Sequence, residues 1–234
     1  MRWTTEPSTE HGVVDRGFAL DLEDHVAPGV LLTPEAIENP LRLVLVGHGR
    51  TLHKRHVAPY SVARRLARRD GVAVALLDQP GHGDRPREED ERPHADRRAM
   101  AVEDWTVALD ALTALPEVDV ERVGYWGLSL GTDYGLPFIA AQRRILVAVL
   151  GLYGTDSIRI GDTQSLEIAA SLRSEVLWVM QWDDELFDRA GQLALFDAIG
   201  SQGKRMVVYP GGHDDTPDEG LRFAREFLIH ELGR

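Results

Sequence analysis

The chain alternates between short apolar runs and segments in which apolar residues recur every three or four positions. An apolar run without alternation is typical of a strand that is buried on both faces of a sheet. Four such runs are Leu43–Val46, Val72–Leu77, Ile145–Leu150 and Val176–Met180. The segments between the runs have the helical spacing, for example at Trp105, Leu109 and Leu112. Alternating buried strands and helices predict a mostly parallel sheet with helices on both faces.

The beginning of the chain has a different pattern. Two apolar-rich runs, Val14–Leu22 and Val26–Leu32, are separated by little more than Glu23 and Asp24, which predicts an antiparallel hairpin. We therefore expect an α/β fold of about eight strands. At the other end, Thr216 and Glu219 flank Pro217 in the pattern of a helix start, with Thr216 as the capping residue.

Composition limits the classes of protein and partner. The chain has 234 residues, 43% of them hydrophobic, and no Pro- or Gly/Ser-rich linker, so we expect one domain over residues 1–234. A formal net charge of -12 argues against nucleic acid as a partner. The absence of a long apolar run and the polar first dozen residues predict a cytoplasmic protein without a membrane partner. There is no cysteine, so a nucleophile would have to be oxygen or nitrogen.

Charged residues gather in two places along the chain. Four arginines, Arg64, Arg65, Arg68 and Arg69, occupy one face of a predicted helix at about residues 57–69, and we expect this face to be solvated. The stretch from Arg85 to Arg98 is so rich in charge that we expect a solvated loop.

Polar chemistry follows the predicted strands, where a sheet of this kind has its ligand site. Ser129 stands between Gly127 and Gly131 directly after an apolar run, and Asp183-Asp184 and His213 follow two later runs. A serine hydroxyl is a weak nucleophile and needs an imidazole to accept its proton, which a carboxylate must in turn orient. A serine, an acid and a histidine at these strand ends therefore make acyl transfer at Ser129 the candidate chemistry, with His213 as the candidate base.

These motifs together resemble those of the α/β-hydrolase superfamily, over about Val14 to Leu232. Gly127–Gly131 is similar to the nucleophile elbow, Asp78–Gly83 to the Asp-x-Pro-Gly-His-Gly loop, and Gly212-His213 to the histidine loop. The resemblance implies that Asp184 is the acid. Because Gln181 stands where the family has glycine, Asp183 stays open as the acid, as does Asp156 after the preceding strand.

By the same resemblance, the oxyanion hole uses the backbone N–H groups of Leu130 and Arg50, with Thr51 as the alternative to Arg50. The side chains of Arg50, Lys54 and Arg55 could contact an anionic substrate, although solvated cations are the commoner interpretation. Four residues are candidates for the substrate pocket, and plain core packing explains them equally well: Leu128, Tyr153, Trp182 and Phe187.

The expected activity is hydrolysis of a small-molecule carboxylic ester without a cofactor. The histidines do not follow the spacing of a zinc site, so we expect no metal. About two dozen residues between Leu150 and Val176 are too few for a large helical cap. The compact, capless pattern resembles small carboxylesterases and dienelactone hydrolases, and the latter use cysteine where this chain has Ser129. Thioester, lactone and peptide hydrolysis stay open, as does a non-catalytic ligand-binding protein on the same fold. The sequence does not predict the oligomeric state.

Overall fold

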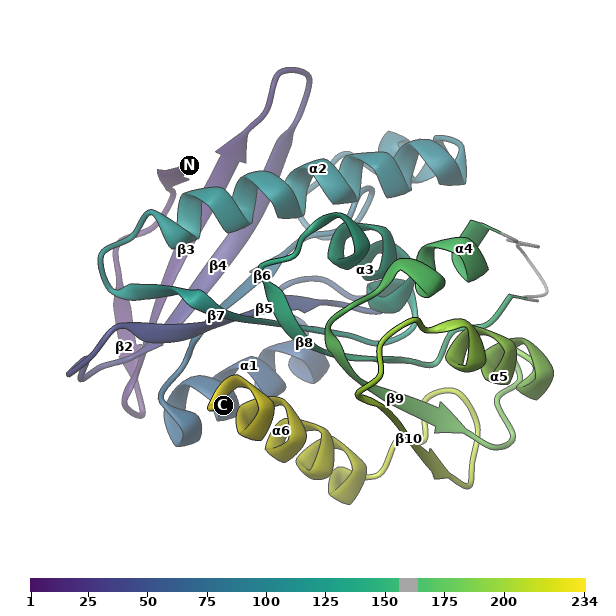
Figure 1. The fold of residues 1–234 in the computed structure, drawn as a ribbon. Coiled ribbons are helices and arrows are strands. Elements are labelled where there is room, and N and C mark those ends of the chain that lie inside the picture. Colours follow the sequence, from purple (N-terminus) through teal and green to yellow (C-terminus); the bar gives the residue numbers. More distant parts are fainter. Residues whose placement is uncertain (156–163) are drawn as a thin grey trace. The chain divides into compact units, whose positions relative to one another are not determined.

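The computed structural model describes residues 1–155 and 164–234, and they form two compact units, Met1–Val123 and Gly124–Arg234 (Figure 1). The strands are β1 (Arg2–Trp3), β2 (Ser8–Glu10), β3 (Val13–Asp21), β4 (Val26–Pro34), β5 (Leu41–Gly47), β6 (Ala73–Leu77), β7 (Val118–Gly127), β8 (Ile145–Gly151), β9 (Glu175–Gln181) and β10 (Lys204–Tyr209). The helices are α1 (Val57–Asp70), the short 3₁₀ helix η1 (Arg87–Glu91), α2 (His94–Thr113), α3 (Leu130–Ala141), α4 (Gln164–Ser171), α5 (Arg189–Ala198) and α6 (Asp218–Leu232).

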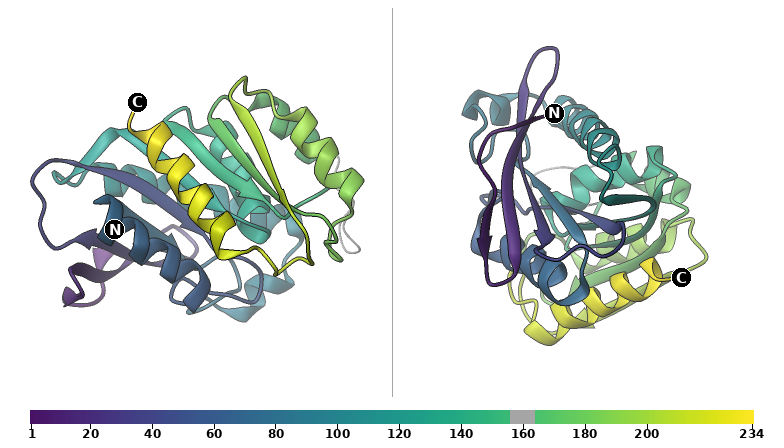
Figure 2. Two further views of the ribbon diagram at one scale, coloured as in Figure 1. Left: turned by 90° about the horizontal axis from the view of Figure 1, so that it is seen from below. Right: turned by 90° about the vertical axis from the view of Figure 1, so that its left-hand side faces the viewer.

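In the first unit the strands pair in the order β1-β3-β4-β6-β5, and β2 pairs with β3. The predicted hairpin is β3 and β4, which pair antiparallel from Val13–Pro34 to Asp21–Val26. β5 and β6 are parallel and almost wholly buried. Helices α1 and α2 lie on opposite faces of these strands (Figures 1 and 2). On α1 the small and apolar residues Ala63, Leu66 and Ala67 are buried, whereas the predicted arginine face is half-buried to exposed.

In the second unit β8, β9 and β10 are parallel neighbours, and β7 enters the unit beside β8. Helix α6 covers one face of these strands, and α3, α4 and α5 lie on the other (Figure 1). Together with the first unit this confirms the predicted α/β class with an antiparallel hairpin at the start. The strands number ten in the described residues, because the short β1 and β2 join β3. That the chain is one domain stays a prediction.

The predicted cap of the last helix is wrong. Helix α6 begins at Asp218, and its N-cap residue is Pro217, which makes no side-chain cap bond. The hydroxyl of Thr216 is instead hydrogen-bonded to the side-chain amide of Gln181 at the end of β9 (2.9 Å). A tertiary hydrogen bond has therefore displaced the local one.

The prediction of a solvated loop over Arg85–Arg98 is also wrong. Much of the stretch is helical, in η1 and the first turn of α2, and Arg85 and Glu89 are buried. Burial of a charge is unfavourable unless the charge is paired. Arg85 meets this condition, because its guanidinium bonds to Glu89 (Nε to Oε2, 2.6 Å) and to Asp104 on α2.

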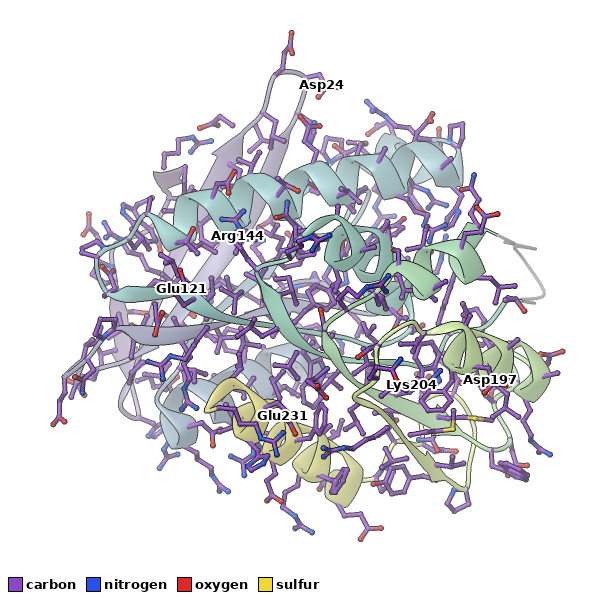
Figure 3. All side chains as sticks on the ribbon, viewed as in Figure 1. Asp24, Glu121, Arg144, Asp197, Lys204 and Glu231 are labelled. Carbon is purple, nitrogen blue, oxygen red and sulfur yellow. The ribbon has the colours of Figure 1, made fainter. Side chains whose placement is uncertain are left out.

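The same network reaches the β3–β4 hairpin through His25. Its ring bonds to Asp104 (Nε2 to Oδ1, 2.6 Å) and to Asp24 at the tip of the hairpin (Nδ1 to Oδ1, 2.6 Å; Figure 3). The hydrogen bond to Asp104 raises the pKa of His25 to about 8, against the opposing effect of burial. The protonated ring thus ties the hairpin to α2.

We predict that this tie weakens as the pH rises. Because the folded state raises the pKa of His25, its contribution to stability is complete below about pH 6.5 and is lost as the pH passes through about 8. Urea denaturation measures how much less stable His25→Gln is than the wild type. After allowance for solvent screening, this loss in free energy of unfolding should be about 1 kcal/mol larger at pH 6 than at pH 9. The exposed His230→Gln is the control. An equal difference at both pH values would contradict the assignment.

Candidate active site

Ser129 sits at a strained corner between β7 and α3. Its backbone torsions are φ 57° and ψ -118°, a conformation that residues with a side chain rarely adopt. The turn requires glycine on the strand side, because a Cβ at Gly127 would lie 2.5 Å from the carbonyl oxygen of Gly131. The Ser129 N–H donates to the Gly151 carbonyl at the end of β8 (3.0 Å). The neighbouring strand thus holds the corner in place.

The buried side chain of Thr132, in the first turn of α3, also stabilises this corner. Its buried hydroxyl oxygen accepts the N–H of Gly151 (2.8 Å) and lies within hydrogen-bond distance of the carbonyl oxygens of Gly127 (2.8 Å) and Gly151 (2.7 Å). One side chain therefore connects the ends of β7 and β8 to α3.

Ser129, His213 and Asp184 form a continuous hydrogen-bonded row. The Ser129 Oγ lies 2.9 Å from His213 Nε2, and His213 Nδ1 lies 2.9 Å from Asp184 Oδ2. An ionised carboxylate can only accept, so Nδ1 carries the ring proton. In the neutral ring Nε2 is then the acceptor and faces the serine hydroxyl. The imidazole is 6% exposed, which shields the row from water.

Asp184 receives four hydrogen bonds. Its Oδ1 accepts the backbone N–H groups of Leu186 (2.8 Å) and Phe187 (3.0 Å), and its Oδ2 accepts His213 and the side-chain amide of Gln192 (3.3 Å). Burial raises the pKa of this carboxyl, but the hydrogen bonds from His213, Phe187 and Leu186 outweigh burial and leave its pKa below the usual value. Asp184 is therefore held ionised beside the imidazole.

The two alternative acids stand apart from this row. Asp183 is exposed, and its carboxylate has an ion pair to Arg189 at 3.9 Å. Asp156 lies outside the described residues. The geometry therefore favours Asp184 over Asp183 as the partner of His213.

The four predicted pocket residues differ in their surroundings. Phe187 packs against the His213 ring (5.7 Å between ring centroids) and against Tyr153 (5.1 Å). Leu128 directly precedes Ser129 and is half-buried. Trp182 is 46% exposed, and its ring is stacked on the guanidinium of Arg189 at 3.6 Å. In the described contacts, Phe187 thus lies directly against the histidine ring, and Tyr153 lies behind Phe187.

The predicted oxyanion donors come from different units. Leu130 is the first residue of α3, and its N–H has no hydrogen-bond partner in the described part of the chain. This N–H is therefore free to donate to a ligand. Arg50 belongs to the first unit, in the turn after β5, where the next residue, Thr51, has φ 68°. The contribution of the Arg50 N–H stays a prediction.

Two buried side chains stabilise the turn after β5. His48 donates from Nδ1 to the Gly49 carbonyl (2.8 Å) and accepts the Gln79 N–H at Nε2 (3.0 Å), and burial lowers the pKa of His48 to about 4. Lys54 forms ion pairs with Asp78 and Asp84. A neutral ring and a paired lysine thus connect this turn to the turn after β6.

The basic side chains named for an anionic substrate are already engaged with carboxylates. Besides Lys54, Arg55 makes two hydrogen bonds to Asp15 (2.6 and 2.7 Å), and Arg50 approaches Asp90 at 3.3 Å. An anionic substrate would have to displace these partners.

A hollow of about 840 Å³ in the first unit is lined mainly by residues 34–42 and 118–122, and none of the predicted site residues lines it. Across residues 1–155 and 164–234, no cluster of three or more His, Asp or Glu side chains is arranged to hold a metal ion. Within the same residues, every helix is too short or too polar to cross a membrane.

Comparison with solved structures identifies the family. The PEG-bound complex of a cold-adapted esterase from an Arctic intertidal metagenomic library is 34% identical, with 99% of this chain and 100% of that chain covered and a TM-score of 0.89. At 34% identity over almost the whole length, the two chains are relatives. The chain belongs to the α/β-hydrolase superfamily.

More distant α/β-hydrolases share the fold. A dienelactone hydrolase from Klebsiella pneumoniae, described as putative, is 16% identical over 95% of this chain and 99% of that chain, with a TM-score of 0.72. An acetyl xylan esterase from Paenibacillus sp. R4 is 15% identical over 99% of this chain and 88% of that chain, with a TM-score of 0.74. No protein-family model and no curated protein matches the chain.

We predict that the Thr132 hydroxyl stabilises this hydrolase fold at the serine corner. Thr132→Val keeps the shape but leaves the Gly151 N–H and two carbonyls without this partner, so the free energy of unfolding should fall by about 1–3 kcal/mol. Urea denaturation at pH 7 measures the change. Thr132→Ser retains the hydroxyl and is the matched control; a Val variant as stable as the Ser variant would contradict the assigned role.

Proposed function

We propose that the chain is a serine esterase that cleaves a small carboxylic ester through an acyl-enzyme at Ser129. The observation that carries the proposal is the hydrogen-bonded row from Ser129 through His213 to the ionised Asp184. The 34% identical relative, whose printed description is that of an esterase, supports the ester as the substrate class.

The proposed reaction has two halves with the same residues. In the first, His213 Nε2 removes the proton of the Ser129 hydroxyl as the oxygen attacks the ester carbonyl, and the protonated ring then gives this proton to the departing alcohol. In the second half, His213 Nε2 takes a proton from water as the water oxygen attacks the acyl-enzyme carbonyl, and the ring then returns the proton to the Ser129 oxygen. This step releases the carboxylic acid and restores Ser129. Asp184 keeps the ring in the required tautomer and stabilises its charged form.

Charge that develops on the carbonyl oxygen needs N–H donors that are already in place. The Leu130 N–H at the start of α3 is the donor that we propose. The ring of Phe187, which packs against His213 and is backed by the buried ring of Tyr153, is the surface that we propose for the apolar part of the ester.

We predict that Ser129→Ala abolishes the activity without unfolding the protein. The wild type should hydrolyse a short-chain 4-nitrophenyl ester and take up one fluorophosphonate on Ser129, detected by intact mass and peptide mapping. The variant should lose the label and at least about a thousandfold in kcat. Labelling of the variant at an unchanged rate would refute the assignment, and a folded wild type that is neither labelled nor active would favour a non-catalytic binding protein.

We also predict that replacement of Asp184 lowers kcat far more than replacement of the adjacent Asp183. Asp184→Asn should lower kcat about 10³- to 10⁴-fold, because an amide does not fix the ring tautomer as the carboxylate does. Asp183→Asn changes the neighbouring carboxylate in the same way and should keep nearly full activity. Steady-state kinetics on the same ester compares them; the opposite ranking would assign the acid to Asp183.

A further inference from the structure

The loop after β9 contacts the histidine loop at four successive residues. The N–H of Trp182 donates to the Tyr209 carbonyl (2.8 Å), and the N–H of Asp183 to the Gly211 carbonyl (3.0 Å). Asp184 then holds the His213 ring, and the next residue, Glu185, accepts the backbone N–H of His213 at its Oε2 (2.9 Å). His213 is thus held twice, by its ring and by its main chain, from two adjacent carboxylates.

Local geometry provides the space that this second contact needs. A Cβ at Gly212 would lie 2.8 Å from the same Oε2 atom of Glu185, so glycine leaves room for the carboxylate. The N–H of Gly212 is already bonded to Asp215 (2.7 Å), a residue of the same loop. Glu185 therefore supplies the bond that fixes the backbone of His213 to the loop carrying its acid.

The consequence concerns alignment of the base. The distance from Nε2 to the Ser129 hydroxyl depends on where the His213 backbone lies as well as on the ring torsions that Asp184 sets. A charge-assisted hydrogen bond to a main-chain N–H is among the stronger neutral-donor bonds in proteins. Errors of about 1 Å in the position of a reacting group can reduce a rate about a hundredfold.

We propose that Glu185 is a positioning residue for the reaction, which acts by holding the His213 main chain in line with Ser129. The inference rests on the proposed serine esterase function. Glu185 makes no contact with Ser129 in the described interactions, and its role is carried through His213.

The test compares Glu185→Ala, which removes the acceptor, with Glu185→Gln, whose amide oxygen still accepts. The expected result is a kcat for the 4-nitrophenyl ester roughly 10- to 100-fold lower in the Ala variant, with KM within about threefold of the wild type. The Gln variant should return to within about threefold of the wild-type kcat. Asp183→Ala, which removes a carboxylate from the same loop, is the matched control and should behave as the wild type.

Hydrogen exchange of the His213 amide gives a readout independent of turnover. Protection should fall in Glu185→Ala and persist in Glu185→Gln and Asp183→Ala, while the rest of the second unit exchanges as in the wild type. If Glu185→Ala were too unstable to purify, Glu185→Ser would remove the same acceptor from this exposed position.

The outcomes separate the inference from the function on which it rests. An active wild type with full kcat in Glu185→Ala would overturn the positioning role, as would equal losses in the Ala and Gln variants. A wild type that neither hydrolyses esters nor labels at Ser129 would overturn the esterase function and with it the catalytic part of the inference. In that case the exchange data would still decide whether Glu185 holds the His213 main chain.

Discussion

The positive φ of Ser129 is the constraint on which the second unit depends. A serine with φ 57° and ψ -118° is strained, and it persists only where the surroundings leave no alternative. Here Gly127 avoids the Gly131 carbonyl, and the end of β8 accepts the serine N–H, where Gly151 itself has φ 143°. The ends of β7 and β8 and the start of α3 therefore hold the strained conformation together, and in it the Ser129 hydroxyl faces His213 Nε2.

Sheet register determines the rest of the row. β9 and β10 pair parallel with Gln181 opposite Tyr209, so the residues that follow them leave the sheet side by side. The four contacts of residues 182–185 with the histidine loop extend this register beyond the last paired residues. Asp183 and Asp184 lie in the turn after β9, where the N–H groups of Leu186 and Phe187 bind Asp184 Oδ1 and its Oδ2 faces His213. The register of β9 and β10 and this turn together bring Asp184, and not Asp183, within hydrogen-bond distance of the His213 ring.

Sequence patterns predicted the buried strands well, because an apolar run records burial on both faces. They also indicated Ser129 and His213 as candidates from local motifs, and the structure places these two side chains within hydrogen-bond distance. They missed β2, whose three residues are all exposed, and the burial of Arg85, whose partner Asp104 is 19 residues away, because neither feature shows in the local apolar pattern. Gln192 and Glu185 escaped notice for the same reason: a glutamine on a helix and a glutamate in an acidic loop carry no local signal of what they bond.

Electrostatics completes the argument for Asp184 as the acid. A carboxylate beside a buried imidazole must stay ionised to stabilise the ring when it gains a proton, yet burial alone would favour the neutral acid. The hydrogen bond from His213 and the backbone N–H groups of Phe187 and Leu186 outweigh this burial and lower the pKa of Asp184, and the two backbone donors add no positive charge that would compete with the imidazolium. Asp184 is therefore kept ionised by His213 itself together with two neutral donors of the loop after β9, and these two donors bind Oδ1 and leave Oδ2 to His213.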